Sequence, residues 1–127
     1  MTSVRAAKSK GSQFEYDSQH SLTAIYPDIY RTAERGFQLQ YDLHSEKSKV
    51  VFECKRLKGI SWNQLVKFYN KLENKAPEDY RKYLLFKSNF QPCLVFFKIN
   101  EYYTIVEFEN LFRVPFEKHP STRKKVK

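Results

Sequence analysis

Apolar residues near the start of the chain recur with a helical period. Those of a helix over residues 12–26 fall on one stripe: Phe14, Leu22 and Ile25. Ser12, with Glu15 three positions later, has the spacing of a capping box, in which each side chain binds a backbone amide at the helix start. Pro27 restricts the residue before it and would end this helix.

A second helical pattern begins after Ser61, which we expect to cap the helix. The apolar residues that follow have helical spacing and would face the core: Trp62, Leu65, Phe68, Tyr69 and Leu72. Further along, Pro77 followed by two acids predicts the start of a third helix. A strand over residues 83–86 is the alternative for this segment.

Five segments have the composition of strands, three before the second helix and two after the third: residues 28–32, 36–43, 50–55, 92–97 and 102–108. The order α-β-β-β-α-(α)-β-β predicts an α+β fold, in which helices flank a mixed central sheet. We expect a single domain over residues 11–114, between a flexible basic arm (residues 1–10) and a basic C-terminal tail (residues 115–127).

Charge narrows the classes of partner. The 127 residues include 23 Lys and Arg but only 14 Asp and Glu, which gives a net charge of +9. Such an excess favours binding to polyanions, with nucleic acid first and a membrane surface second. Aromatic residues make up 17% of the chain and can either build a core or stack on bases.

The two cysteines, Cys54 and Cys93, are isolated within apolar runs, which is typical of reduced thiols in an intracellular protein. The histidines and cysteines lack the spacing of a zinc site. No apolar run approaches membrane-spanning length. We therefore expect an intracellular protein without a membrane segment, cytoplasmic or nucleoid-associated, or in the host cytoplasm if the source is viral.

The strand at residues 50–55 ends in a charged triplet that carries the candidate chemistry. Residues two apart in a strand share a face, so Glu53 and Lys55 would emerge together, opposite Phe52. Asp42, on the preceding strand, could bring a second carboxylate to the same place. Two carboxylates and a lysine can bind a hard divalent cation and act on a phosphate ester. A solvated salt bridge is the alternative for the E-x-K pair.

Taken in order, these residues resemble the motifs of the PD-(D/E)xK nuclease superfamily, and within it those of the archaeal-type Holliday junction resolvases. The resemblance covers residues 10–112. The matching positions are the first-helix segment KGSQFE (residues 10–15), Arg31, Asp42, the triplet Glu53-Cys54-Lys55, Gln64 and the strand at residues 91–98.

Three features depart from the family pattern. Tyr41 stands where a proline usually precedes the first acid, and Glu34-Arg35-Gly36 replaces the Ser-Gly of the family's mobile loop. The segment 75–89 is longer than the family needs. These departures weaken the resolvase assignment more than the nuclease assignment, because the metal-site motifs are retained.

The resemblance implies a restriction-endonuclease-like core and a metal-dependent DNA endonuclease that cuts four-way junctions as a homodimer. Asp42 and Glu53 would bind Mg²⁺, for which Mn²⁺ can substitute, and Glu15 would add a carboxylate directly or through water. Lys55 would position the attacking water and counter phosphate charge. Gln64 would hydrogen-bond water or the metal ligands.

Basic residues around this site are expected to contact phosphates: Lys8, Lys10, Arg31, Arg35 and Lys58. Apolar residues are candidates for the dimer face, with an ordinary core role as the alternative: Phe96, Tyr102, Tyr103 and Phe112. Three other functions remain open. They are a flap, duplex or restriction-type nuclease on the same core, a non-catalytic nucleic-acid-binding module, and a protein-interaction domain with basic tails.

Overall fold

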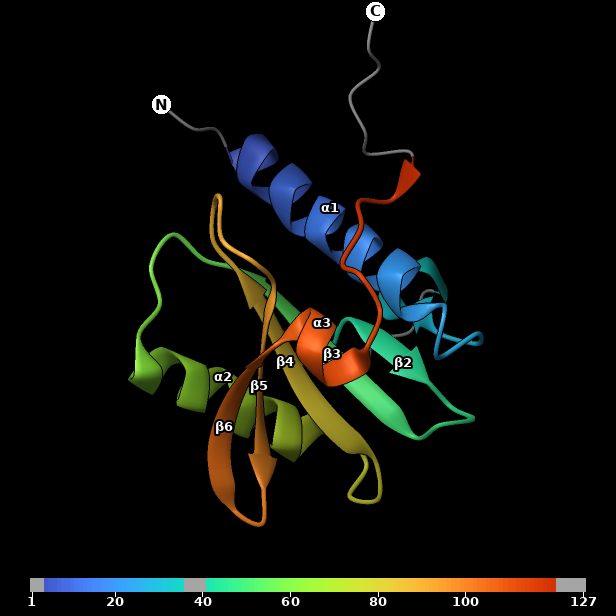
Figure 1. Ribbon diagram of the computed structural model, residues 1–127, viewed down its shortest axis with the longest axis vertical. Coiled ribbons are helices and arrows are strands. Elements are labelled where there is room, and N and C mark those ends of the chain that lie inside the picture. Colours follow the sequence, from blue (N-terminus) through green and yellow to red (C-terminus); the bar gives the residue numbers. More distant parts are fainter. Residues whose placement is uncertain (1–3, 36–40, 121–127) are drawn as a thin grey trace, which may run out of the picture.

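The computed structural model describes residues 4–35 and 41–120, with side chains from residue 12 onward. Its elements form one mixed sheet with helices around it (Figure 1). In chain order they are α1 (Val4–Leu22), β1 (Tyr30–Arg31), the 3-10 turn η1 (Thr32–Arg35), β2 (Leu43–Ser45), β3 (Val50–Arg56), α2 (Trp62–Lys75), β4 (Arg81–Lys87), β5 (Leu94–Ile99), β6 (Tyr102–Glu107) and α3 (Phe108–Phe112).

The six strands lie side by side in sequence order, from β1 at one edge to β6 at the other. All neighbouring pairs are antiparallel except β3 and β4, which run parallel with Phe52 opposite Tyr83. A parallel pair needs a long crossover connection, and here α2 provides it. The predicted α+β class with a mixed central sheet is confirmed.

Alternate residues of β3 pack against different helices, so α1 and α2 cover opposite faces of the sheet. On the α1 face, Phe52 is fully buried, and its ring lies 5.8 Å from Tyr26, 5.6 Å from Tyr83 and 5.9 Å from Phe112. On the α2 face, Val51 packs against Leu72. The alternation of β3 therefore carries the core on both sides and fixes the direction of Glu53 and Lys55.

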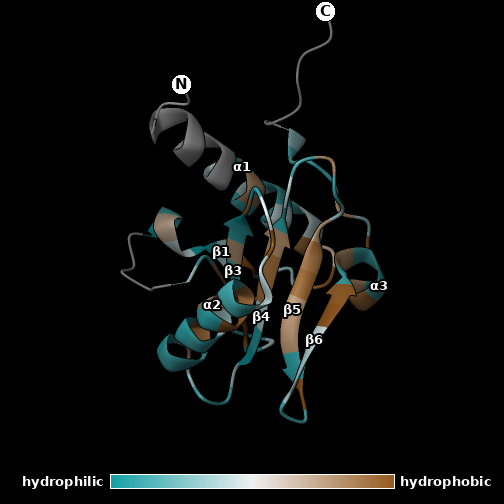
Figure 2. Cartoon of the chain, turned by 90° about the vertical axis from the view of Figure 1, so that its left-hand side faces the viewer, coloured by the Kyte–Doolittle hydropathy of each residue, from teal (hydrophilic) through white to brown (hydrophobic). Residues whose placement is uncertain are grey.

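The amphipathic pattern of α2 is confirmed. Ser61 caps the helix, and its Oγ accepts a hydrogen bond from the backbone amide of Gln64. Leu65, Tyr69 and Leu72 are buried against the sheet. Figure 2 shows hydrophilic residues on the outer side of α2 and hydrophobic residues along the strands beneath it.

Two predictions near the N-terminal half need correction, and a third lies mostly outside the described residues. The first helix begins at Val4, so Ser12 lies inside α1 and the predicted capping box is wrong. Gly11 is tolerated within the helix, at a cost of roughly 1 kcal/mol in helix propensity. Residues 4–10, which the sequence assigned to an arm, therefore belong to α1. The predicted strand 36–43 lies mostly outside the described residues, and β2 starts only at Leu43.

The third predicted helix is also wrong, and the alternative strand is confirmed in extended form as β4. Pro77 starts a turn instead, in which the Tyr80 amide donates to the Pro77 carbonyl at 3.1 Å. β4 then pairs along its whole length with β3. This long-range pairing outweighs the local helix signal.

The segment after α3 is not a free tail over its first part. The Phe116 ring lies 5.8 Å from Phe14 of α1. The amides of Glu117 and His119 donate to Ser21 Oγ (2.9 Å) and Asp17 Oδ1 (2.7 Å), respectively. Residues 116–119 are therefore attached to α1.

Candidate metal-binding site at the β2–β3 edge

The start of β2 brings Asp42 against β3. The Asp42 amide donates to the Phe52 carbonyl at 3.0 Å, so the backbones pair at this point. Its carboxylate Oδ2 accepts a hydrogen bond from the Cys54 amide at 2.7 Å. The side chain thus takes the place of a backbone carbonyl beside β3. This bond holds the carboxylate next to the E-x-K triplet.

Glu53 and Lys55 both point toward the α2 side of the sheet. Lys55 Nζ lies 4.8 Å from the centre of the Phe68 ring of α2. Glu53 is half-buried, and burial raises the pKa of its carboxyl. Hydrogen bonding to Asp42 and the negative charge of Asp42 raise this pKa further, whereas Lys55 and Lys75 lower it. Burial and the neighbouring Asp42 thus favour the protonated form of Glu53 when no cation is present.

Glu15 reaches the same region from α1. Burial raises the pKa of Glu15 to about 7, and the negative charge of Asp42 adds to this effect. Arg31 and Lys55 act in the opposite direction. Glu15 Oε1 lies 3.3 Å from Arg31 Nη2, so this carboxylate is already held by an ion pair. Glu15 is therefore close enough to sense Asp42 but is directed at Arg31.

These contacts decide how far the acids fit a metal ion. Among the residues with described side chains, no three or more His, Cys, Asp or Glu are grouped so that they could hold a metal. The predicted ligand set of Glu15, Asp42 and Glu53 is thus not assembled, because Glu15 is paired with Arg31. Asp42 and Glu53 fit a hard cation by donor chemistry, since Mg²⁺ is usually bound by one or two carboxylates and several waters.

Gln64 lies in the first turn of α2 and is exposed. It precedes Phe68 by four residues and so shares that face of the helix. Phe68 in turn contacts Lys55. Gln64 therefore lies on the lysine side of the site, away from the two acids.

Arg31, which the sequence predicts as a phosphate contact, is held among protein groups in the structure. Only 7% of the residue is exposed, and its guanidinium pairs with Glu15 and Glu34, each at 3.3 Å. The same group lies 3.8 Å from the centre of the Tyr16 ring. Its Nε is buried and has no hydrogen-bond partner among the described residues. Arg31 is a structural residue that connects α1 to η1.

The other predicted DNA contacts have different outcomes. Lys58 is exposed in the loop after β3. Arg35 is exposed, and its guanidinium stacks 3.7 Å from the centre of the Tyr30 ring. Lys8 and Lys10 lie in α1, outside the residues whose side chains are described.

A scan against protein-family models finds no match, and a search of curated proteins finds none either. One solved structure is similar. It is Hjc of Archaeoglobus fulgidus, a Holliday junction resolvase from an archaeal hyperthermophile, with 16% sequence identity and a TM-score of 0.45. The similarity covers 85% of this chain and 99% of that chain.

Sequence reasoning assigned no role in this site to two of its residues. Lys75, at the end of α2, lowers the pKa of Glu53, and Phe68 supports Lys55. Phe68 and Lys75 lie four and eleven positions after Gln64. Residues at these spacings share a helix face, and this is the signal that could have found them.

Among the described helices, none is long and apolar enough to cross a membrane.

The raised pKa of Glu15 predicts how stability changes with pH. An unfolded Glu loses its proton near pH 4.5, whereas folded Glu15 keeps it to about pH 7. Between these values the folded protein holds a proton that the unfolded chain has released, so stability falls as the pH rises through this window. Glu53, whose pKa is also raised, contributes a slope of the same sign.

Thermal denaturation in EDTA at several pH values measures this effect. The Glu15→Gln variant is expected to gain stability relative to the wild type as the pH increases from 5 to 8. Parallel pH profiles of the two proteins would contradict the assignment.

Proposed function

We propose that this protein is a divalent-metal-dependent DNA endonuclease that cuts four-way junctions. The observation that carries the proposal is the adjacency of the Asp42 and Glu53 carboxyls, with Lys55 beside them on β3. Two like charges held together cost free energy unless a proton or a cation lies between them. A divalent cation would take the place of the proton on Glu53.

In this proposal Asp42 and Glu53 hold Mg²⁺, and Mn²⁺ can substitute. The metal supplies positive charge near the scissile phosphate and lowers the pKa of bound water. Lys55, placed by Phe68, orients a water molecule and counters the charge that develops on phosphate. Glu15 reaches the centre through water and holds a proton near neutral pH. Gln64 orients water from the far side of Lys55.

The net charge of +9 supports DNA as the substrate. Arg35 and Lys58 are exposed cations and would contact phosphates. Such contacts position the substrate without reading its sequence. A junction has two strands to cut, so two equivalent sites in a symmetric dimer suit it.

The direct test is a cleavage assay with a four-way junction, a flap and a linear duplex, each with and without Mg²⁺. The proposal predicts cleavage that requires metal and is fastest on the junction. Cleavage of all three substrates at similar rates would support a less specific nuclease on the same core. No cleavage of any substrate at millimolar metal would contradict the enzyme assignment.

One observation favours a second candidate, a non-catalytic nucleic-acid-binding protein. The described acids do not group into a three-ligand metal site. This candidate predicts binding to DNA that weakens with salt and does not respond to metal. The same assay, combined with binding measurements in EDTA, distinguishes the two.

Arg35→Gln and Lys58→Gln are each expected to weaken binding to any DNA of the same shape. If each cation neutralises one phosphate, the slope of log K against log salt decreases by about 1 per variant. Lys49→Gln is a matched control, because Lys49 already pairs with Asp79 at 3.0 Å. Equal slopes in all the proteins would exclude these two residues from the DNA contact.

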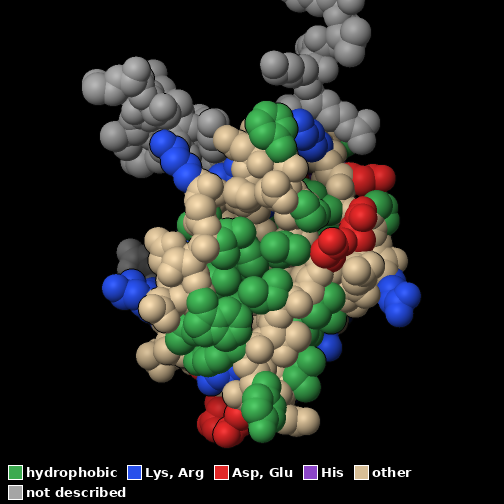
Figure 3. Space-filling model, turned by 60° about the vertical axis from the view of Figure 1, so that its left-hand side comes forward, with side chains coloured by type: hydrophobic (Ala, Val, Ile, Leu, Met, Phe, Trp, Pro, Cys, Tyr) green, Lys and Arg blue, Asp and Glu red, His purple; other side chains and the backbone are tan. Residues whose placement is uncertain are grey.

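The predicted candidates for the dimer face are divided between the core and the surface. Phe96 and Phe112 are buried core residues and cannot form it, whereas Tyr102 is exposed at the β5–β6 turn. Figure 3 shows hydrophobic side chains gathered on one face of the molecule. We place the dimer contact on the exposed Ile60, Trp62 and Ile105, at the border of α2 and β6.

Trp62 lies over this border, because its ring is 5.4 Å from that of Phe96 and Phe96 pairs with Ile105 in the sheet. Ile105→Glu is expected to convert a dimer of twice the 15.3 kDa chain mass into a monomer in light scattering. Ile99→Glu, half-exposed on the other face of the sheet, is the control. A wild type that is monomeric at micromolar concentration would contradict the dimer.

A further inference from the structure

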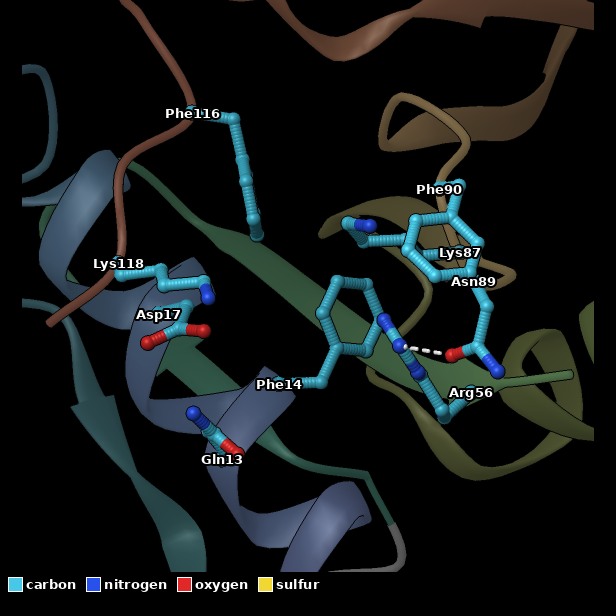
Figure 4. A pocket seen from close by; sticks show the side chains of 9 residues that line it. All are labelled: Gln13, Phe14, Asp17, Arg56, Lys87, Asn89, Phe90, Phe116 and Lys118. Carbon is cyan, nitrogen blue, oxygen red and sulfur yellow. Dashed lines mark hydrogen bonds between the residues drawn. The ribbon is translucent and has the colours of Figure 1, made fainter. Parts of the chain in front are cut away.

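A cavity of about 430 Å³ lies between α1, the ends of β3 and β4, and residues 116–118 (Figure 4). Its volume is within the range of small-ligand pockets, about 300–1,000 Å³. Glu15, Asp42 and Glu53 do not line it. Lys55 and Arg56 are consecutive in β3 and point to opposite faces, so Arg56 enters this cavity while Lys55 serves the acids.

Cations dominate the walls of the cavity. Arg56, Lys87 and Lys118 line it, and within the described residues none of them forms an ion pair with a carboxylate. One carboxylate, Asp17, also lines it and accepts the His119 amide at 2.7 Å. Burial lowers the pKa of Lys87, and the charges of Arg56 and Lys118 lower it further. Like charges gathered in a hollow attract an anion.

The same cavity carries aromatic rings. Phe14 and Phe116 form apolar walls, 5.8 Å apart between ring centres. Phe90 lies in the turn between β4 and β5, and its side chain is fully exposed. Its backbone φ is 63°, which is an uncommon conformation for a bulky residue. In Figure 4 the Phe90 ring lies beside Lys87 and Asn89 at the side of the cavity.

Cations next to an exposed aromatic ring match the two parts of a nucleotide. A phosphate is bound by Lys and Arg, and a base stacks on an aromatic side chain whatever its sequence. Asn89 is fixed by its bond to Arg56, because Arg56 Nη2 donates to Asn89 Oδ1. This bond holds the guanidinium at the cavity.

We propose that this cavity binds one nucleotide of an unpaired DNA strand, with its phosphate at Arg56, Lys87 and Lys118 and its base on Phe90. The proposal rests on the proposed function for its substrate class. At the branch point of a junction strands pass from one duplex to another, and base pairs there can open. An enzyme that cuts near a branch gains positioning from a site that holds a nucleotide whose pair has opened.

The test uses the full chain in EDTA, so that binding is measured without cleavage. The probe is a six-nucleotide single strand that contains 2-aminopurine, whose fluorescence is quenched by stacking. The wild type is expected to quench it on binding. Phe90→Ala is expected to abolish the quenching and to weaken binding about tenfold. Tyr102→Ala is the matched control, because Tyr102 is an exposed aromatic residue in the next turn of the chain.

Lys118→Gln, beside the control Lys49→Gln, tests the phosphate part of the site. Lys118→Gln is expected to reduce the salt slope of single-strand binding by about 1, and Lys49→Gln to leave it unchanged. Deoxyadenosine monophosphate is expected to compete with the strand at lower concentration than inorganic phosphate. If the mononucleotide competes as strongly as an unlabelled strand, the site is assigned to free nucleotides, which carry the same phosphate and base.

Three results overturn the proposal. They are unchanged quenching in Phe90→Ala, equal competition by inorganic phosphate and the mononucleotide, and equal salt slopes in Lys118→Gln and the wild type. Junction cleavage is scored separately. If the junction is cleaved but Phe90→Ala binds the single strand as tightly as the wild type, the cavity assignment is wrong and the nuclease assignment is retained. If binding depends on Phe90 and no substrate is cut, the nuclease assignment fails and the nucleotide site stands.

Discussion

Glu53→Gln is expected to cleave a four-way junction in Mg²⁺ at a rate at least about 100-fold lower than that of the wild type. Changes to residues that only support a metal ligand already cost about 10- to 100-fold, and the loss of a ligand costs more. Glutamine keeps the shape of the side chain and removes the negative charge. The remaining Asp42 carboxylate cannot bind the cation as tightly.

The fold of this variant is expected to remain intact. Glu53 lies beside Asp42, and burial and Asp42 already favour its neutral form, so a neutral amide suits this position. The melting temperature at pH 8 should therefore equal or exceed that of the wild type. Glu46→Gln, an exposed acid in the β2–β3 turn, is the matched control and should cleave normally. Full cleavage by a folded Glu53→Gln protein would rule out the proposed centre.

Arg31→Ala is expected to lower the free energy of unfolding by about 2–4 kcal/mol. Its side chain is only 9% exposed and pairs with Glu15, whose side chain is 20% exposed. Removal of the guanidinium leaves Glu15 without its cation and takes a packed group away from Tyr16. It also removes an influence that lowers the pKa of Glu15, so this carboxyl would stay neutral at higher pH.

Arg35→Ala is the control for this effect. Arg35 is exposed and contacts only the Tyr30 ring among the described interactions, so its loss should change stability by about 1 kcal/mol or less. Urea denaturation of both variants measures the difference. Equal stabilities for the two variants, or Arg31→Ala as stable as the wild type, would contradict a structural role for Arg31.

The elements that sequence predicted well are those whose signal is local. The alternation in residues 50–55 and the cap at Ser61 both depend on neighbours a few positions away, and both agree with the structure. β4 was assigned to a helix because its identity depends on pairing with β3, about thirty residues earlier in the chain. Gly11 led to a wrong start for α1, because one weak helix former does not interrupt a helix that the flanking residues continue.

The residues of the candidate site also differ in how far they could be predicted from sequence. Asp42 and the E-x-K triplet could be related from sequence, because neighbouring strands bring their ends together. The fate of Arg31 could not, because a cation becomes a buried ion-pair partner only when α1 packs across β1. The same packing takes Glu15 away from the predicted metal set. Spacing along the chain can indicate which residues lie close together. The tertiary fold decides which opposite charge each side chain pairs with.

The central claim is that Asp42 and Glu53 form a cation site. Crystals of the full chain soaked in millimolar Mn²⁺ above pH 7.5, with diffraction recorded at the manganese absorption edge, test it most directly. The account predicts an anomalous peak in contact with both carboxylates, which is absent from Glu53→Gln crystals. A wild-type map with no peak between these two side chains would contradict it.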